Sequence, residues 1–305
     1  MKEIFKYSCL IFLYSLAGTY IATCFAIDLK IQGYEERVIG FGLSFWGIGV
    51  IIGAIFHNLI RKKFNLITTI FLGSLIQLLF SLIFLIEINI YLVILMQLIA
   101  GISNAVNSLT IESFISDKYK KSSGFYISLF WSSAGLGAIT GSLIIAVNGI
   151  NQFTYYFAVS FYILHFLPML IFRKSFIKIF IKNVHIRLTK DNLNKIKYLL
   201  ICVILFGACD AGFSSLFPSY LIEGFFTDKQ IGQINFLAGT IALLFYPFMG
   251  KLIDKYDKTK IFNIFCTINL INIILLHNIN DYYLYIICVA FYYYTIGTVF
   301  LITFN

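Results

Sequence analysis

Asp210 stands near the middle of the apolar stretch 197–221, where a charged side chain is exceptional. Ser214 follows one helical turn later, so a helix over this stretch would place the carboxyl and the hydroxyl on one face. If the stretch crosses a membrane, inserting the carboxylate costs roughly 2.5–3.5 kcal/mol, and such acids are functional candidates by default. A carboxyl in this place could carry a proton between the two sides of a membrane. The alternative is a structural hydrogen bond to a hydroxyl such as Thr19 or Thr23.

A second group of residues, most of them polar, recurs at steps of three or four within the apolar stretch 90–115. Its members are Gln97, Gly101, Asn104, Ser108 and Glu112. This spacing puts them on one face of a helix. Because an unsatisfied polar group in lipid costs several kcal/mol, the face must contact protein or water. Two interpretations stay open: the wall of a polar cavity, and hydrogen bonds between helices that are worth about 0.6 kcal/mol each.

Two short polar turns share a third pattern, in which a glycine and an acid or histidine precede basic residues. The segment Tyr246–Phe262 has the sequence YPFMGKLIDKYDKTKIF, and Gly53–Phe64 has the sequence GAIFHNLIRKKF. Each turn stands between two long apolar runs. The residues that follow the pattern are Gly53, Arg61 and Lys62 in one turn, with His57 in the place of the acid, and Gly250, Asp254, Lys258 and Lys260 in the other.

The composition places these residues in a membrane. Of the 305 residues, 60% are hydrophobic and 12% are charged, whereas soluble domains contain about half apolar and about a quarter charged residues. Ten apolar stretches approach the ~20 residues that a transmembrane helix needs. They cover 7–28, 38–60, 65–88, 90–115, 122–147, 152–172, 197–221, 229–252, 261–279 and 282–304. The sequence therefore predicts an all-α polytopic membrane protein with ten transmembrane helices.

The net charge of +9 indicates orientation in the membrane and not a nucleic-acid partner. If the N-terminus is cytoplasmic, all but three of the 23 Lys and Arg residues fall on the cytoplasmic side, the exceptions being Lys30, Arg37 and Lys229. Basic residues collect in cytoplasmic loops. We therefore predict an integral protein of the plasma (bacterial inner) membrane, surrounded by membrane lipids, with its N-terminus in the cytoplasm.

No catalytic or metal site is expected. The six cysteines stand inside apolar runs without paired spacing, which favours neither a disulfide framework nor a zinc site. The sequence contains no G-x-x-x-x-G-K-[ST] loop, no H-E-x-x-H and no G-x-S-x-G. We therefore expect no enzyme, no cofactor and no ATP-driven pump.

The long hydrophilic connection 173–196 divides the chain into two bundles. We predict a six-helix bundle at 1–172 and a four-helix bundle at 197–305, joined by this basic cytoplasmic linker. The linker could lie on the anionic membrane surface as an amphipathic helix, or it could be a solvated connection. The segment from Gly33 to Gly40 has a counterpart from Gly224 to Gly232, at an offset of about 190 residues, which indicates a tandem repeat.

The two polar turns resemble the loop motif of the major facilitator superfamily, which is similar to G-x-x-x-D followed by basic residues, once in each half. His57 departs from that pattern, because the family usually has the acid there. The resemblance covers essentially the whole sequence. It implies twelve helices in two bundles of six around a cavity lined by helices 1, 4, 7 and 10, counted along the chain. We therefore expect this chain to lack the last two helices, and within the family it resembles efflux permeases.

The resemblance also implies roles for individual residues. The residues that would contact the substrate or protons are Asp210, Gln97, Asn104, Ser108, Ser214 and Tyr292. The residues that would gate the inner face are Gly53, Arg61, Glu112, Gly250, Asp254 and Lys258. In this scheme Glu112 pairs with Arg61, and Asp254 acts with Lys258 and Lys260. The alternative for Glu112 is a solvated charge at a helix end, where ion pairs are worth only ~0–1 kcal/mol.

The function that the resemblance implies is secondary active transport. The protein would move a small organic solute by alternating access, as a monomer, with protons coupled through Asp210. Export is slightly favoured over uptake. The alternative is a truncated remnant that does not transport, or a regulatory membrane protein, because the family's acid is missing at His57 and the second bundle is short.

Overall fold

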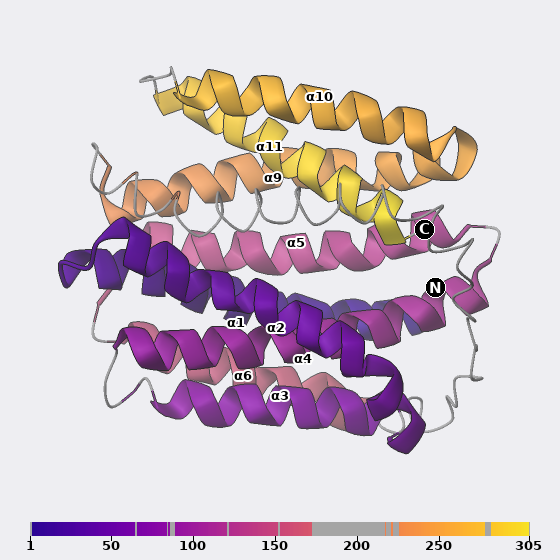
Figure 1. Cartoon of the computed structure of the whole chain (residues 1–305), viewed down its shortest axis with the longest axis horizontal. Helices are drawn as coiled ribbons and strands as arrows, with labels where there is room; N and C mark the ends of the chain where they lie inside the picture. The colour runs from indigo at the N-terminus through magenta and orange to yellow at the C-terminus, as the bar shows by residue number, and fades with distance from the viewer. Residues whose placement is uncertain are drawn as a thin grey trace.

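The computed structural model is all-α over the part of the chain that it describes (Figure 1). The described residues are 2–64, 66–83, 85, 89–120, 122–151, 153–172, 217, 221, 226–277 and 282–304. The predicted linker 173–196 and most of the apolar stretch 197–221 lie outside these residues. Phe217 and Leu221, which belong to that stretch, are helical.

The first half of the chain forms six helices, as the apolar stretches predict. They are α1 (Lys2–Ile31), α2 (Glu36–Lys63), α3 (Leu66–Ile83), α4 (Ile90–Lys118), α5 (Ser123–Asn148) and α6 (Thr154–Ile171). Three helices of the second half are described: α9 (Asp228–Lys255), α10 (Lys258–His277) and α11 (Tyr282–Phe304). Six of the described helices are long and apolar enough to cross a membrane, or seven if the bent helix α9 is one span. The prediction of an all-α polytopic membrane protein is confirmed.

The ends of the helices follow local sequence signals. Asn89 begins α4, because its side-chain oxygen accepts a hydrogen bond from the amide of Leu92 at 3.0 Å. Gly149 ends α5 with a φ of 68°, in the left-handed region that favours glycine. Gly33, with a φ of 87°, reverses the chain between α1 and α2.

Small residues bring the backbones of α2 and α4 together. A Cβ on Gly49 would lie 3.0 Å from the Cα of Gly101, and a Cβ on Gly53 would lie 2.9 Å from the Cβ of Ala105. Close approach of this kind favours packing through dispersion, which is the main attraction between helices in lipid. Gly49 and Gly53 therefore serve the packing of α2 on α4, and the gating role implied for Gly53 stays a prediction.

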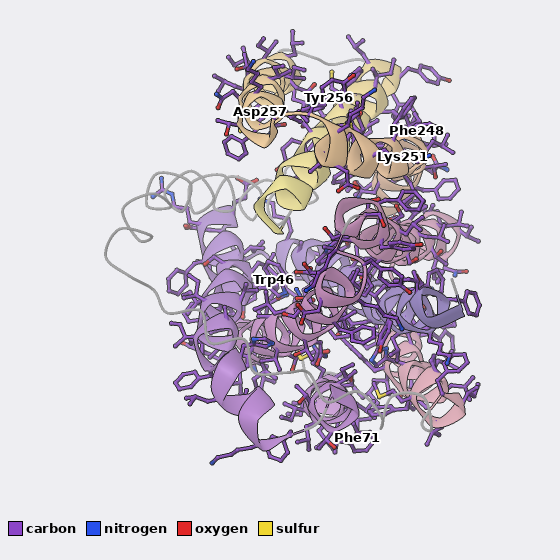
Figure 2. The ribbon with its side chains drawn as sticks, turned by 90° about the vertical axis from the view of Figure 1, so that its right-hand side faces the viewer. Trp46, Phe71, Phe248, Lys251, Tyr256 and Asp257 are labelled. Carbon is purple, nitrogen blue, oxygen red and sulfur yellow. The ribbon has the colours of Figure 1, made fainter. Side chains whose placement is uncertain are left out.

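The helices lie side by side along the long axis of the molecule, and α5 lies between α9 and the remaining helices of the first half (Figure 1). In that half α5 packs on α1, where Gly137 and Gly141 face Leu16. Helices α10 and α11 lie beyond α9, and α3 lies at the far edge. In the view along the helices, Tyr256 and Asp257 mark the second half and Phe71 marks the opposite edge (Figure 2).

Apolar side chains of both halves form one cluster near the end of the molecule that carries the two basic turns. The members from the first half include Tyr7, Ile111 and Phe130, and those from the second half are Met249, Ile253 and Phe262. All of them are nearly inaccessible to solvent. The two halves are therefore in close contact at this end, which we call the basic end.

Candidate functional site: the interface between the two halves

The principal contact between the halves in the described part of the chain is the antiparallel pair α5 and α9. Glycines of α9 face α5 along its length. A Cβ on Gly239 would lie 2.8 Å from the Cγ1 of Ile139, and a Cβ on Gly250 would overlap the Oγ of Ser128. In an antiparallel pair the residue number rises along one helix as it falls along the other. The two numbers add up to the same value in both pairs, so the helices pack without a shift between these contacts.

At the basic end the carboxylate of Asp254 crosses from α9 to the first turn of α5. Its Oδ1 accepts a hydrogen bond from the amide of Gly124 at 3.1 Å, and its Oδ2 accepts one from the amide of Phe125 at 3.0 Å. The first amides of any helix have no partner within that helix. Ser122, which precedes α5, makes no capping bond with its side chain. Asp254 therefore caps a helix of the other half.

The electrostatics of this contact are favourable. A helix N-terminus carries a partial positive charge, so a carboxylate there is stabilising by about 0.3–1 kcal/mol when exposed. The Nζ of Lys251 lies 5.4 Å from the ring centroid of Phe125, which adds a second contact between α9 and α5 (Figure 2 shows Lys251). The predicted partner Lys258 has a side chain outside the described residues, so its pairing with Asp254 stays a prediction.

Glu112 is a buried carboxylate within the membrane span of α4. It is 5% exposed, and its Oε1 accepts a hydrogen bond from the indole Nε1–H of Trp131 on α5 at 2.9 Å. The side chain of its predicted partner Arg61 lies outside the described residues. In the structure Glu112 therefore ties α4 to α5, a role that the sequence did not suggest. The gating pair of Glu112 with Arg61 stays a prediction.

The polar stripe of α4 divides into residues with different surroundings. Gly101 packs against the backbone of α2, and the hydroxyl of Ser108 donates to the carbonyl of Asn104 in its own helix at 2.7 Å. Gln97 is buried and Asn104 is half-buried. Contact of Gln97, Asn104 and Ser108 with a substrate remains a prediction.

The other predicted substrate residues belong to the second half. Tyr292 on α11 is fully buried, with its ring centroid 6.0 Å from that of Tyr293. The hydroxyl of Tyr293 lies 3.0 Å from Asn235 Oδ1 and ties α11 to α9. Asp210 and Ser214 lie outside the described residues, so their roles stay predictions.

A polar network that the sequence did not predict joins α1, α3 and α4 in the first half. The amide nitrogen of Gln77 on α3 donates to the hydroxyl of Tyr14 on α1 at 2.8 Å and to the carbonyl of Ala100 on α4 at 3.3 Å. The hydroxyl of Ser103 donates to the carbonyl of Gly73 at 3.0 Å. A glutamine inside a span as apolar as 66–83 is the signal that could have revealed the network, because a polar group in lipid needs a protein partner.

His57, which stands where the family pattern has an acid, also bonds within the first half. Its Nε2 lies 3.0 Å from the Oγ1 of Thr110 on α4, and its side chain is 6% exposed. The Thr110 hydroxyl donates to the carbonyl of Val106 at 2.6 Å, so its oxygen is free to accept from the imidazole. The position that corresponds to Asp254 therefore stabilises the packing of α2 on α4.

Within the described part of the chain, no group of three or more His, Cys, Asp or Glu side chains could hold a metal ion. The carboxylates of Glu112 and Asp254 bond to N–H donors instead. What this arrangement can do chemically is to make and break hydrogen bonds across an interface, and to hold a carboxyl group within the membrane.

Comparisons with known proteins agree with this architecture. The structure is similar to those of the nucleoside transporter NupG (TM-score 0.70, 13% identity, covering 99% of this chain and 80% of that one) and of a bacterial homolog of the human lysosomal transporter Spinster (TM-score 0.69, 12% identity, 98% and 74%). It is also similar to a D-xylose–proton symporter (TM-score 0.62, 13% identity, 97% and 79%). No curated protein sequence matches the chain. The family model of the Major Facilitator Superfamily matches residues 7–305, and the chain therefore belongs to this family of membrane transporters.

Proposed function

We propose that this protein moves a small organic solute across the membrane by alternating access and couples that movement to protons. The observation that carries the proposal is the trans cap that Asp254 of one half places on α5 of the other half. A carboxylate that bonds to backbone amides across an interface can release them and bind them again. It makes these bonds only while the halves are closed at that end, which is the differential contact that a two-state switch requires.

The basic end would face the cytoplasm. The turns between α2 and α3, between α4 and α5, and between α9 and α10 all lie at this end. These turns and the helix ends beside them carry most of the basic residues in the described part of the chain. Lys and Arg concentrate in cytoplasmic loops. On this orientation the trans cap of Asp254 closes the inner gate, and its release opens the cavity towards the cytoplasm.

Proton coupling would rest on Asp210, which the sequence places in the predicted helix 197–221, and on Glu112 in α4. Ionisable groups inside a membrane are costly, and they mark ion or proton pathways. The described partner of Glu112 is the neutral indole of Trp131, which can bond to the carboxyl group in either protonation state. One protein of similar fold is described as a proton symporter, which is consistent with this chemistry.

The solute would be small, organic and polar. The similar structures belong to proteins described as transporting nucleosides and D-xylose, but at 12–13% identity they bear on the fold alone. Buried amide, hydroxyl and phenol groups such as Gln97, Ser108 and Tyr292 suit a solute with hydrogen-bonding groups. Export is the direction that the matches in the fourth and eighth predicted helices, 90–115 and 229–252, slightly favour.

Reconstitution of the full chain into liposomes tests the proposal. Solutes of different classes are first screened by the thermal shift of the purified protein, and those that stabilise it are then tested for flux. An imposed pH gradient should drive accumulation of one of them. The variants Asp210→Asn and Glu112→Gln should keep solute exchange without a gradient, while at least one of them loses accumulation driven by the gradient. Glutamine still accepts the bond from Trp131, which makes Glu112→Gln a test of the proton and not of packing.

The same experiment addresses the alternative of a membrane protein that does not transport. That alternative is favoured by one observation, the histidine at position 57 where the family pattern has an acid. His57 is bonded to Thr110 in the interior of the first half and does not disrupt it. A protein that binds solutes but shows neither exchange nor accumulation would support the alternative and overturn the proposed function.

A further inference from the structure

The pair α5–α9 carries a second carboxylate contact, at the end opposite to Asp254. Asp228 is the first residue of α9, and its Oδ2 accepts a hydrogen bond from the amide of Ile150 at 2.7 Å. Ile150 follows the last turn of α5, so this bond also joins the two halves. The other oxygen, Oδ1, accepts from the amide of Lys229 in its own helix at 2.8 Å.

The local sequence leaves this carboxylate available for the other half. The N-terminus of α9 is already capped by Thr227 and Gln230, whose side chains and amides form a complete capping box. Gly149 then provides the space on the side of α5, because a Cβ at that position would lie 2.7 Å from the Oδ2 of Asp228. Its φ of 68° also turns the chain so that the amide of Ile150 leaves the helix.

Both carboxylate contacts belong to a single register. The two contacts are separated by the same number of residues on both chain segments, 26 from Gly124 to Ile150 and 26 from Asp228 to Asp254. The contact of Gly232 with Ala146 lies between them in the same register. At 1.5 Å per residue, 26 steps amount to about 39 Å, close to the full thickness of a bilayer with its interfaces. One helix of the second half therefore holds one helix of the first half at both faces of the membrane.

We propose that Asp228 is the latch of the outer gate and that it alternates with Asp254 during the transport cycle. This inference rests on the alternating-access function proposed above. When the halves rock, α5 and α9 separate at one end and stay together at the other. The outward-open state then breaks the bond of Asp228 to Ile150, and the inward-open state breaks the two bonds of Asp254 to Gly124 and Phe125.

The two latches differ in strength. Asp254 accepts two amides at the N-terminus of α5, where the helix dipole favours an anion. Asp228 accepts one amide of the other half, beyond the C-terminus of α5, where the dipole of that helix opposes an anion. The Asp254 end is therefore the harder one to open, and the protein without solute opens more readily at the Asp228 end.

Two serines of α5 provide matched reporters for the test. The carbonyl of Ser142 lies beside Gly232 near the outer end, and the hydroxyl of Ser128 lies beside Gly250 near the basic end. Both residues are buried. Each is replaced by cysteine, which is nearly the same size. The rate of reaction with a charged, water-soluble maleimide is then measured on the full chain in nanodiscs, where both faces are accessible. The reaction of the parent chain, which has six native cysteines, is subtracted.

The expected result is a crossed pattern. Asp228→Ala raises the labelling of Ser142→Cys by about ten- to a hundredfold, as expected for the loss of a charge-assisted hydrogen bond, and leaves Ser128→Cys unchanged. Asp254→Ala raises the labelling of Ser128→Cys and leaves that of Ser142→Cys unchanged. Asp228→Asn keeps one acceptor oxygen and gives a smaller rise at Ser142→Cys. The control Asp28→Asn, in a residue that bonds to Tyr155 inside the first half, changes neither rate.

Unchanged labelling of Ser142→Cys in both Asp228 variants overturns the outer latch, whether or not Ser128→Cys responds to Asp254→Ala. The measurement needs neither solute nor flux. A crossed pattern in a protein that fails to transport would uphold the latch and reject the proposed function, so the two proposals fail separately.

Discussion

The carboxylate of Asp254 accepts the amide of Gly124 at 3.1 Å, a bond that joins residues 130 positions apart in the sequence. It links the last turn of one helix to the first turn of another, and the two helices belong to different halves of the transporter. Because Ser122 does not cap the N-terminus of α5 with its own side chain, the carboxylate of Asp254 from the other half takes that place.

Removal of this cap should shift the protein towards the state that is open at the basic end. We expect Asp254→Ala to raise the population of that state at least tenfold, because hydrogen bonds to a charged group are worth about 1.5–3 kcal/mol each. Electron-spin distance measurements between labels at the exposed positions Lys120 and Asn263 would report the opening.

Asp257→Ala is the control for this experiment. Asp257 caps the amides of Thr259 and Lys260 at the start of its own helix α10, at 2.8 and 3.1 Å, so it has the same chemistry without a link between halves. Its loss should leave the distance distribution unchanged. Equal distributions for Asp254→Ala and the parent protein would contradict the gating role of Asp254.

Close packing at Gly250 should be as important as the cap itself. A Cβ at this position would overlap the Oγ of Ser128 and lie 2.8 Å from the carbonyl of Gly124. We expect Gly250→Ala to lower the free energy of unfolding by about 1–3 kcal/mol, as overpacking does elsewhere, and to lower the thermal midpoint in detergent. Adding Ser128→Gly should recover part of the loss.

Gly18→Ala is the matched control, since a Cβ on Gly18 would meet no atom within 4 Å. In the interior of α1 the alanine should raise stability by up to about 1 kcal/mol, because it restricts the unfolded chain. A decrease of the same size in both variants would show that close contact is not the cause.

The helices could be predicted because each is an apolar run of nearly the length that a bilayer demands. The paired basic turns also singled out Asp254, which the structure places at the interface between the halves, and its gating role stays a prediction. Its partners could not be predicted, because they are backbone amides, which leave no trace in residue type. The same limit applies to Asp228, whose partner is the amide of Ile150.

The internal repeat is informative about topology and misleading about contacts. Aligning Gly33–Gly40 with Gly224–Gly232 places Glu36 opposite Asp228, at the first position of α2 and of α9. Glu36 lies 3.6 Å from Lys30 of its own half, whereas Asp228 bonds across the interface. Two halves with related sequences thus use equivalent acids differently, since each acid responds to the neighbour that tertiary packing provides.

The bond between Glu112 and Trp131 should depend on the indole donor more than on the charge of the acid. Trp131→Phe keeps an aromatic ring but leaves a buried carboxyl group without this donor. We expect it to lower the thermal stability by an amount equivalent to about 1–3 kcal/mol, which is the cost of an unsatisfied buried group. Glu112→Gln, which retains an acceptor, should cost much less. The opposite order would indicate that Glu112 is held by a charged partner such as Arg61.

The last prediction concerns the histidine that replaces the acid in the first half. Since the Thr110 hydroxyl donates to Val106, the imidazole of His57 must donate from Nε2, and the bond ties α2 to α4. His57→Phe keeps the ring and removes the donor, while Thr110→Val keeps the shape and removes the acceptor. A double-mutant cycle in unfolding free energy should give a coupling of about 0.6 kcal/mol, with an upper limit near 1.7 kcal/mol, as for hydrogen bonds between other membrane helices. Neither variant should change the distance between labels at Lys120 and Asn263, because the bond lies within one half. Additive losses together with a shift in that distance would mean that His57 acts across the interface, in the manner of Asp254.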